Sequence, residues 1–163
     1  MQSCALRGLT VFETIHGDAA IEDAHSSSEV CIDDPDASGD PHACTPGCRG
    51  LLRDHAYMIC SVQAPWAVAE KDCEAHGMRL VRIDDEAENT WIHEVAFGFG
   101  IDRNWLGGSD THASGDWRWA DGTQFWSGLA SGMPVGGLYT NWDSGEPNDM
   151  GDSEHCVVMF DKM

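Results

Sequence analysis

Residues 141–159, NWDSGEPNDMGDSEHCVVM, join a polar, oxygen-rich stretch to an apolar end. The polar stretch belongs to a longer segment, residues 123–153, in which Gly, Ser, Asn, Asp and Pro are frequent and aromatic residues are scattered. This composition predicts a long structured loop, and such loops are usually functional or held by a metal ion. The apolar end, residues 156–160, predicts a final strand.

Two helices are predicted before this loop. The first covers residues 66–76, where apolar residues recur at helical spacing, and Gly77 provides its stop. The second begins after Asp84 or Asp85, either of which can cap its first turn. Its apolar face would consist of Ala87, Trp91, Ile92 and Val95. Short strands are expected at residues 55–60, 80–83, 105–108 and 117–119.

The charge of the chain restricts its partners. Nine basic residues against 28 acidic residues give a formal net charge of −19. A field of this sign repels nucleic acid and anionic membranes and attracts divalent cations, although it also serves plain solubility. No apolar run approaches the ~18 residues of a membrane-spanning helix. We therefore expect neither nucleic-acid binding nor membrane insertion.

The seven cysteines indicate an oxidising compartment, although the first 20 residues lack the features of a secretory signal. The odd count leaves at least one thiol free or paired elsewhere. Residues 1–47 are acidic, contain three of the cysteines, and have few large apolar residues from position 21 onward. We expect a flexible or loosely stapled leader over residues 1–47 and one domain over residues 48–163.

From residue 48 onward, an ordered set of motifs resembles the C-type lectin-like family. The matching segments are residues 66–73, 77–83, 88–92, 105–108, 115–122, 141–148 and 154–159. Each is weak alone, whereas their order is specific. The resemblance implies an α+β fold with two helices, a small antiparallel sheet and a long loop that carries the binding site. It also implies a disulfide between Cys48 and Cys60, which match the paired cysteines of an N-terminal hairpin.

The chain departs from the family at its C-terminal end. Family members continue with a Trp-Asn-Asp strand and a last strand, and these carry cysteines that pair with the equivalents of Cys156 and Cys73. This sequence stops at Met163, so we expect the last strands to be missing and both cysteines to lose those partners. Each missing bridge typically costs ~2–5 kcal/mol in a small secreted domain.

The resemblance also implies a calcium site around Pro147. Glu146 and Asn148 supply side-chain oxygens, which are the hard ligands that calcium prefers. In the family the peptide bond before this proline is cis, and a further ligand stands at the position of Glu154. Asp149 would serve this site or an auxiliary one. The expected metal ligands are therefore Glu146, Asn148, Glu154 and Asp149, with Ca²⁺ as the cofactor.

In the family, two neighbouring sugar hydroxyls complete the calcium shell. Each hydroxyl gives a lone pair to the ion, donates its proton to a carboxylate and accepts from an amide. The Glu-Pro-Asn order resembles members that choose equatorial 3- and 4-hydroxyls, as in mannose. We therefore expect carbohydrate binding through Glu146, Asn148 and Glu154, a sugar or glycoprotein partner, and a secreted or cell-surface location.

The residues themselves leave other interpretations open. Glu-Pro-Asn also suits a plain turn, since Pro and Asn are ordinary turn residues. The fold would then be a calcium-independent module that binds a protein partner, or an inactive fragment of a longer lectin.

Metal-dependent catalysis is a further alternative. A possible tetrahedral zinc set comprises Cys44, Cys48, His55 and Cys60. Disulfides suit a cysteine-rich acidic chain better than zinc does. His93-Glu94 begins like a metalloprotease helix motif, but Phe97 stands where its second histidine belongs. Because no nucleophile motif or phosphate loop stands out either, we do not expect an enzyme.

Overall fold

The computed structural model describes residues 8–14, 48–53 and 55–160, apart from the side chains of residues 8–14. Two helices, α1 (Trp66–Ala75) and α2 (Glu86–Gly98), and a mostly antiparallel sheet give the predicted α+β fold. The strands are β1 (Gly8–Thr14), β2 (Cys48–Leu52), β3 (Ala56–Ala64), β4 (Met78–Leu80), β5 (Arg103–Ser109), β6 (Asp116–Arg118), β7 (Gln124–Ser127), β8 (Met133–Pro134) and β9 (Cys156–Phe160).

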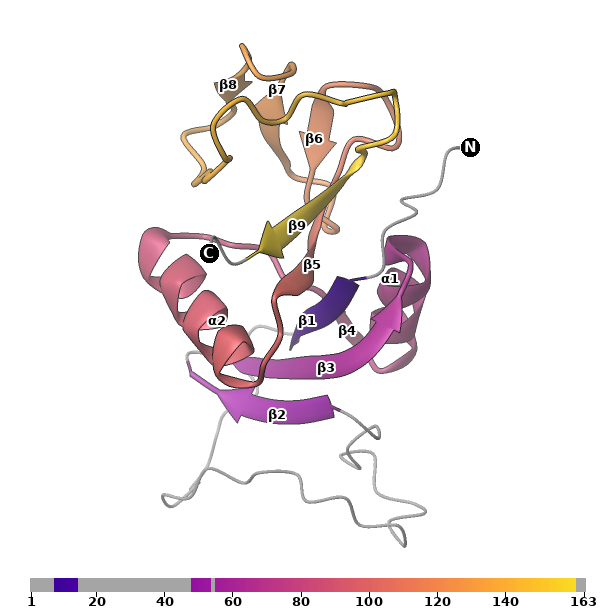
Figure 1. Ribbon diagram of the computed structural model, residues 1–163, viewed down its shortest axis with the longest axis vertical. Helices are drawn as coiled ribbons and strands as arrows, with labels where there is room; N and C mark the ends of the chain where they lie inside the picture. Colours follow the sequence, from indigo (N-terminus) through magenta and orange to yellow (C-terminus); the bar gives the residue numbers. More distant parts are fainter. Residues whose placement is uncertain (1–7, 15–47, 54, 161–163) are drawn as a thin grey trace, which may run out of the picture.

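The strands form one sheet with the order β2-β3-β1-β5-β6-β7-β8, to which β4 and β9 add at β1 and β5. Figure 1 shows α1 and α2 on opposite sides of β1 and β5, with β6, β7 and β8 gathered at the far end from β2. The long loop that precedes β9 lies at this far end too. The architecture therefore separates a helical half from a loop-rich half, and β5 and β9 connect the two.

The strand β1 differs from the flexible leader expected over residues 1–47. One of its edges pairs with β3, and the other pairs with β5 at its start and with β4 at its end. Among the described strands, β1 is the link through which β2 and β3 join the rest of the sheet. Its sequence, GLTVFET, contains residue types that favour strands. The rest of the expected leader, residues 1–7 and 15–47, lies outside the described residues.

A proline in β1 should test this central position. Phe12 aligns with Met58 of β3 and with Leu80 of β4. We expect Phe12→Pro to lower the free energy of unfolding by roughly 1–3 kcal/mol more than Phe12→Ala, because only proline removes a backbone donor and leaves an acceptor unpaired. Urea unfolding followed by circular dichroism measures this difference. Equal losses for the two variants would contradict a central role for the β1 backbone.

Both helices begin and end for local reasons that the sequence shows. Trp66, Ala69 and Cys73 form the buried stripe of α1, and Gly77 follows it at a φ of +68°, which glycine adopts without strain. Asp85 caps α2, since its side chain accepts a hydrogen bond from the Glu88 N–H at 2.8 Å. The predicted helical spacing and capping are confirmed.

The buried face of α2 agrees with the predicted one at Ile92, which is buried, and at Trp91 and Val95, which are partly buried against the main core. Glu88, Ile92 and Ala96 form the buried stripe, whereas Ala87 is exposed. The Glu88 carboxylate accepts hydrogen bonds from the Tyr57 hydroxyl and from the Asp84 N–H, both at 2.7 Å. Because each of its oxygens accepts a hydrogen bond, this carboxylate is tolerated in the interior. The face of α2 that carries Glu88 can therefore point inward.

The cysteines are in three different states. Cys48 and Cys60 lie opposite each other on β2 and β3 and form the expected disulfide. Cys73 is free and buried, its thiol donates to the Ala69 carbonyl at 2.9 Å, and burial raises the pKa of this thiol. Cys156 is disulfide-bonded, and its partner lies outside the described residues. Of the two cysteines, Cys73 and Cys156, the structure leaves Cys73 as a free thiol.

Candidate functional site

An aromatic cluster holds the long loop against β6 and β7. The Trp142 ring lies 5.0 Å from Trp117, 6.1 Å from Phe125 and 6.2 Å from Trp126, between ring centroids. Trp117 and Phe125 are themselves buried in the main hydrophobic core. The partly buried Trp142 therefore packs the long loop against the main core.

Glu146 and Asn148 lie in direct contact within this loop. The peptide bond between Glu146 and Pro147 is cis, as the resemblance implied. The Asn148 side-chain amide donates to Glu146 Oε1 at 2.6 Å, and the Asn148 backbone N–H donates to Glu146 Oε2 at 2.9 Å. Pro147 is buried while Asn148 is exposed, so the turn is anchored in the protein and presents its polar side chains to solvent.

Glu154 shares a cavity wall with Glu146. Both residues line a cavity of about 630 Å³, together with Trp117, Tyr139 and Trp142. One oxygen of Glu154 accepts from the Met150 N–H at 3.1 Å, which closes the intervening turn. The structure therefore places two of the expected carboxylates on one cavity and pairs one of them with the expected amide.

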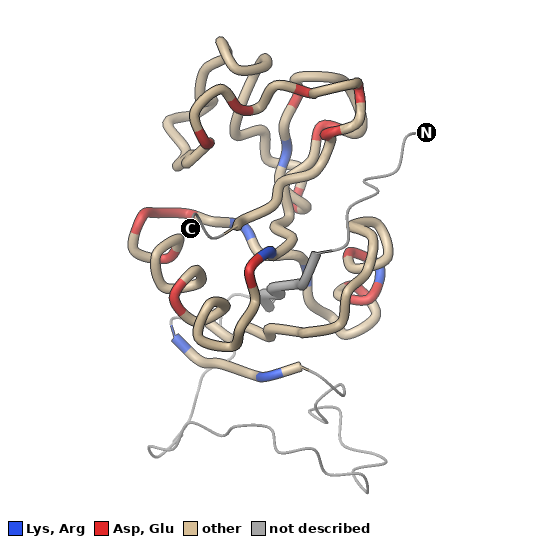
Figure 2. The backbone as a smooth tube through the Cα atoms, in the orientation of Figure 1, with Lys and Arg blue, Asp and Glu red and all other residues tan. Residues whose placement is uncertain are grey.

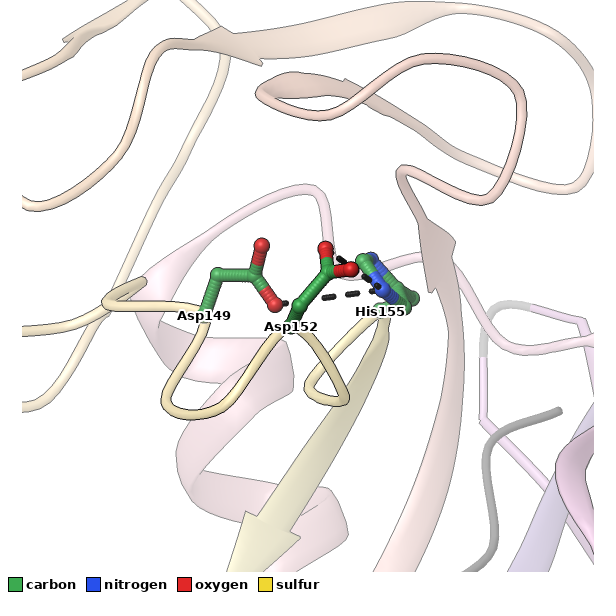
Figure 3. Close-up of side chains that lie close together, drawn as sticks. All are labelled: Asp149, Asp152 and His155. Carbon is green, nitrogen blue, oxygen red and sulfur yellow. Dashed lines mark ion pairs between the residues drawn. The ribbon is translucent and has the colours of Figure 1, made fainter. Parts of the chain in front are cut away.

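Asp149 belongs to a different group of side chains. The ligand atoms of Asp149, Asp152 and His155 lie within 4.8 Å of one another, the only such cluster of His, Cys, Asp and Glu found among the described residues. Figure 3 shows the two carboxylates beside the imidazole ring, with dashed lines to it. His155 Nε2 lies 3.8 Å from Asp149 Oδ1 and 4.0 Å from Asp152 Oδ1.

A buried carboxylate holds the other side of the His155 ring. Asp110, at the end of β5, is 1% exposed, and its Oδ1 lies 2.9 Å from His155 Nδ1. Its second oxygen accepts from the Gly115 N–H at 2.7 Å. Burial disfavours the charged imidazole, but the hydrogen bond and charge of Asp110, with the charge of Asp149, outweigh this and raise the pKa of His155.

Sequence reasoning assigned no role to Asp110, Asp152 or His155. The one local signal is the Asp-x-x-Asp-x-x-His spacing over residues 149–155. Nothing local links Asp110 to His155, because they lie 45 positions apart and meet only through the pairing of β5 with β9.

The loop carries a strong negative potential. Residues 141–155 contain five Asp and Glu residues and no Lys or Arg. Figure 2 shows acidic positions along the whole course of this loop. Such a segment attracts cations, as the net charge of the chain predicts.

The alternative zinc set does not hold for the described residues. Cys48 and Cys60 form a disulfide with each other, so their sulfurs are not metal ligands. His93, the first residue of the other metal-binding candidate, stacks on Phe97 one turn later on α2, with 6.4 Å between ring centroids. Disulfides are therefore the correct interpretation of this cysteine pair.

The family model for the lectin C-type domain matches residues 62–163. The chain belongs to the C-type lectin domain family. This lectin domain is 30% identical over 105 residues to ladderlectin of Oncorhynchus mykiss, a match that covers 63% of the chain and 49% of ladderlectin. It is 33% identical over 95 residues to hepatic lectin of Gallus gallus, covering 58% of the chain and 40% of that protein. The chain thus spans about half the length, or less, of these relatives.

A solved structure agrees with this assignment. The carbohydrate-recognition domain of mouse scavenger receptor C-type lectin superposes with a TM-score of 0.55 at 26% identity, covering 72% of this chain and 82% of that one. C-type lectin domains generally bind Ca²⁺, and the relatives named here are lectins rather than enzymes. No helix in the described part of this lectin domain is long and apolar enough to cross a membrane.

Proposed function

We propose that this lectin domain binds carbohydrate in a calcium-dependent manner through Glu146, Asn148 and Glu154. The observation that carries the proposal is the direct contact between the Glu146 carboxylate and the Asn148 amide at the solvent-exposed turn. A carboxylate acceptor beside an amide donor matches a pair of neighbouring sugar hydroxyls, each of which donates one hydrogen bond and accepts another.

The donor set also fits calcium. Glu146, Asn148 and Glu154 offer carboxylate and amide oxygens, which are hard ligands, and the surrounding loop is strongly acidic. A bound calcium ion would polarise the sugar hydroxyls, while these side chains orient them. Three side chains fill only part of the 6–8 positions that calcium takes, so we propose an affinity weaker than the ~10⁻⁴–10⁻³ M of extracellular modules.

For the sugar itself, we propose equatorial 3- and 4-hydroxyls, as in mannose, because carboxylate precedes amide along the turn. The partner is then a free saccharide or a glycoprotein. We also propose that the protein works outside the cell or at its surface, since disulfides such as those of Cys48–Cys60 and Cys156 are typical of oxidising compartments.

Affinity chromatography tests the proposal. We expect the protein to be retained on mannose resin in millimolar calcium and released by a chelator. The double variant Glu146→Gln/Asn148→Asp exchanges the two groups without changing the net charge. We expect it to lose at least tenfold in mannose affinity and to gain retention on galactose resin, because the acceptor and donor swap places.

The matched control is Glu94→Gln, which removes one exposed carboxylate on α2 and should leave retention unchanged. Equal retention of the wild type with and without chelator would refute calcium dependence. If calcium also failed to raise the melting temperature, a calcium-independent protein-binding role would be favoured.

A further inference from the structure

We propose that the edge of β9 that faces away from β5 binds an extended segment of a partner polypeptide, consisting of a run of apolar residues followed by Lys or Arg. The segment would add to the sheet as an antiparallel strand and fill the cavity of about 630 Å³ that β9 lines, which we call the β9 cavity. This binding requires neither calcium nor sugar, so it goes beyond the proposed carbohydrate binding and does not depend on it.

The β9 cavity lies along an edge of the sheet. Among the described strands, β9 pairs only with β5, so its other edge faces no strand. All five residues of β9 line the cavity. Successive side chains of a strand point to opposite faces, so a cavity over one face would meet alternate residues. Lining by every residue of β9 indicates a cavity at the strand edge, where an added strand would lie.

The sequence of β9 does not discourage pairing, in contrast to the two strands at the ends of the sheet. The end strand β2 contains Arg49, and the end strand β8 is two residues long and contains Pro134. Charged residues, proline and short length are the usual devices that protect a strand edge. The sequence of β9, CVVMF, has no charge and no proline, and Phe160 is 42% exposed. Such an edge is a template for another strand.

The two faces of β9 determine the composition of the added segment. Val157 and Met159 pack in the main core, whereas Cys156 and Val158 pack against a second cluster that includes Trp105. An added strand would continue both layers and be buried on both faces. Strands of this kind are continuous apolar runs rather than alternating ones. We therefore expect a run of apolar residues that matches the length of β9.

The charge of the β9 cavity determines which partner is favoured. Glu146 and Glu154 line it, and no Lys or Arg of the described residues does. A second copy of this chain would bring a further net charge of −19, and residues 15–47 of the chain contain no Lys or Arg. Charge complementarity therefore favours a cationic segment of another protein over self-association.

The position of the carboxylates sets the direction of the segment. Glu154 stands just before β9 begins, and Figure 1 shows the long loop at the same end of this strand. An antiparallel strand ends where β9 begins, and antiparallel pairing is slightly more stable per residue than parallel pairing. The Lys or Arg should therefore follow the apolar run, where it meets the carboxylates.

Titration of a fluorescent probe peptide into the full-length, oxidised chain tests the proposal. The probe has five alternating valines and tyrosines followed by two lysines, and fluorescence anisotropy measures its binding with a chelator present. We expect the probe to bind, and a probe with two glutamates in place of the lysines to bind at least tenfold more weakly. Moving the lysines to the start of the apolar run should also weaken binding.

Backbone methylation of the probe distinguishes strand pairing from plain apolar contact. A strand bonds to one neighbour through alternate residues. N-methylation of one alternate set of probe amides should therefore weaken binding at least tenfold, whereas methylation of the other set should be tolerated. Hydrogen exchange of the β9 amides that do not face β5 should slow when the unmodified probe binds, because pairing engages them.

Two variants of the chain test the two ends of the β9 cavity. Glu154→Gln should weaken binding of the lysine probe several-fold and leave unchanged the binding of a probe that ends in two serines. Phe160→Ser should weaken both probes, because it shortens the apolar edge. Glu74→Gln is the matched control, since it removes an exposed carboxylate on α1 and should leave binding unchanged. Melting temperatures measured in parallel show that each variant is folded.

Equal affinity for the lysine and glutamate probes would overturn the proposal, as would equal effects of the two methylation sets. Sedimentation of the chain alone tests the other occupant. A dimer at micromolar concentration that Phe160→Ser dissociates would overturn the proposal in favour of self-association through β9. Because every probe titration is made with chelator, absence of mannose retention together with intact probe binding would refute the carbohydrate proposal alone.

Discussion

Replacement of Trp105 by alanine is expected to remove most of the stability of this lectin domain. Trp105 is 1% exposed on β5 and packs in a buried cluster that includes Trp66, Cys73 and Leu80. Its indole N–H donates to the Ala64 carbonyl at 2.8 Å. Truncating a buried Trp to Ala typically costs about 3–5 kcal/mol, against a total of about 5–15 kcal/mol for a folded domain.

Equilibrium unfolding in urea, followed by circular dichroism, measures this loss. Trp105→Phe keeps part of the ring volume but leaves the Ala64 carbonyl without its donor, so we expect an intermediate loss. Phe97→Ala is the control, because Phe97 is 58% exposed and surface changes usually stay within about 0.5 kcal/mol. A loss below about 1 kcal/mol for Trp105→Ala would show that β5 does not carry the core.

Gly107→Ala is expected to have the second large effect. An added Cβ at this position would lie 2.5 Å from the Leu80 carbonyl oxygen and 3.2 Å from that of Val81. Both obstacles are backbone atoms, and the Gly107 N–H already donates to the Val81 carbonyl at 2.8 Å. Because neither strand can yield without breaking this contact, we expect a loss of roughly 1–3 kcal/mol from overpacking.

Gly98→Ala provides a matched control for the same chemical change. Gly98 ends α2, and an added Cβ there meets no atom within 4 Å. Alanine should be neutral or stabilising at this position, because it favours a helix over glycine. Melting temperatures of the two variants give the comparison, and similar values for both would contradict the close approach of β5 to residues 80–81.

The features that the sequence predicted correctly are those with a local signal. Helical spacing placed Trp66, Ala69 and Cys73 on one buried stripe, although it also included Ala67, which is exposed, and Asp85 was one of two expected caps. The order of motifs implied the lectin fold, the cis bond before Pro147 and the Cys48–Cys60 disulfide. Each of these rests on residues that are near in sequence or on a fixed order of segments.

Burial on α2 shows where local periodicity stops being sufficient. The sequence placed Ala87 on the apolar face of this helix and did not place the neighbouring Glu88 there. In the fold, Glu88 is inside because Tyr57, 31 positions away, donates to its carboxylate. Helical periodicity counts apolar residues, so it misses a polar residue whose partner arrives from another strand.

The strand β1 and the Asp149–Asp152–His155 cluster depended still more on tertiary structure. A seven-residue segment of moderate strand preference becomes a central strand only when β3, β4 and β5 supply partners on both edges. The His155 ring, which lies beside Asp149 and Asp152 in the loop, is held by Asp110. This contact exists only because β5 pairs with β9.

By itself, the sequence determined the secondary structure of the helices, the family, and the oxygen-bearing turn at residues 146–148. The tertiary structure alone decided which strand completes the sheet and which buried carboxylate pairs with His155. The physical reason is range: backbone propensity and spacing act over a few residues, whereas hydrogen-bond partners and burial are set by contacts between segments far apart in the chain.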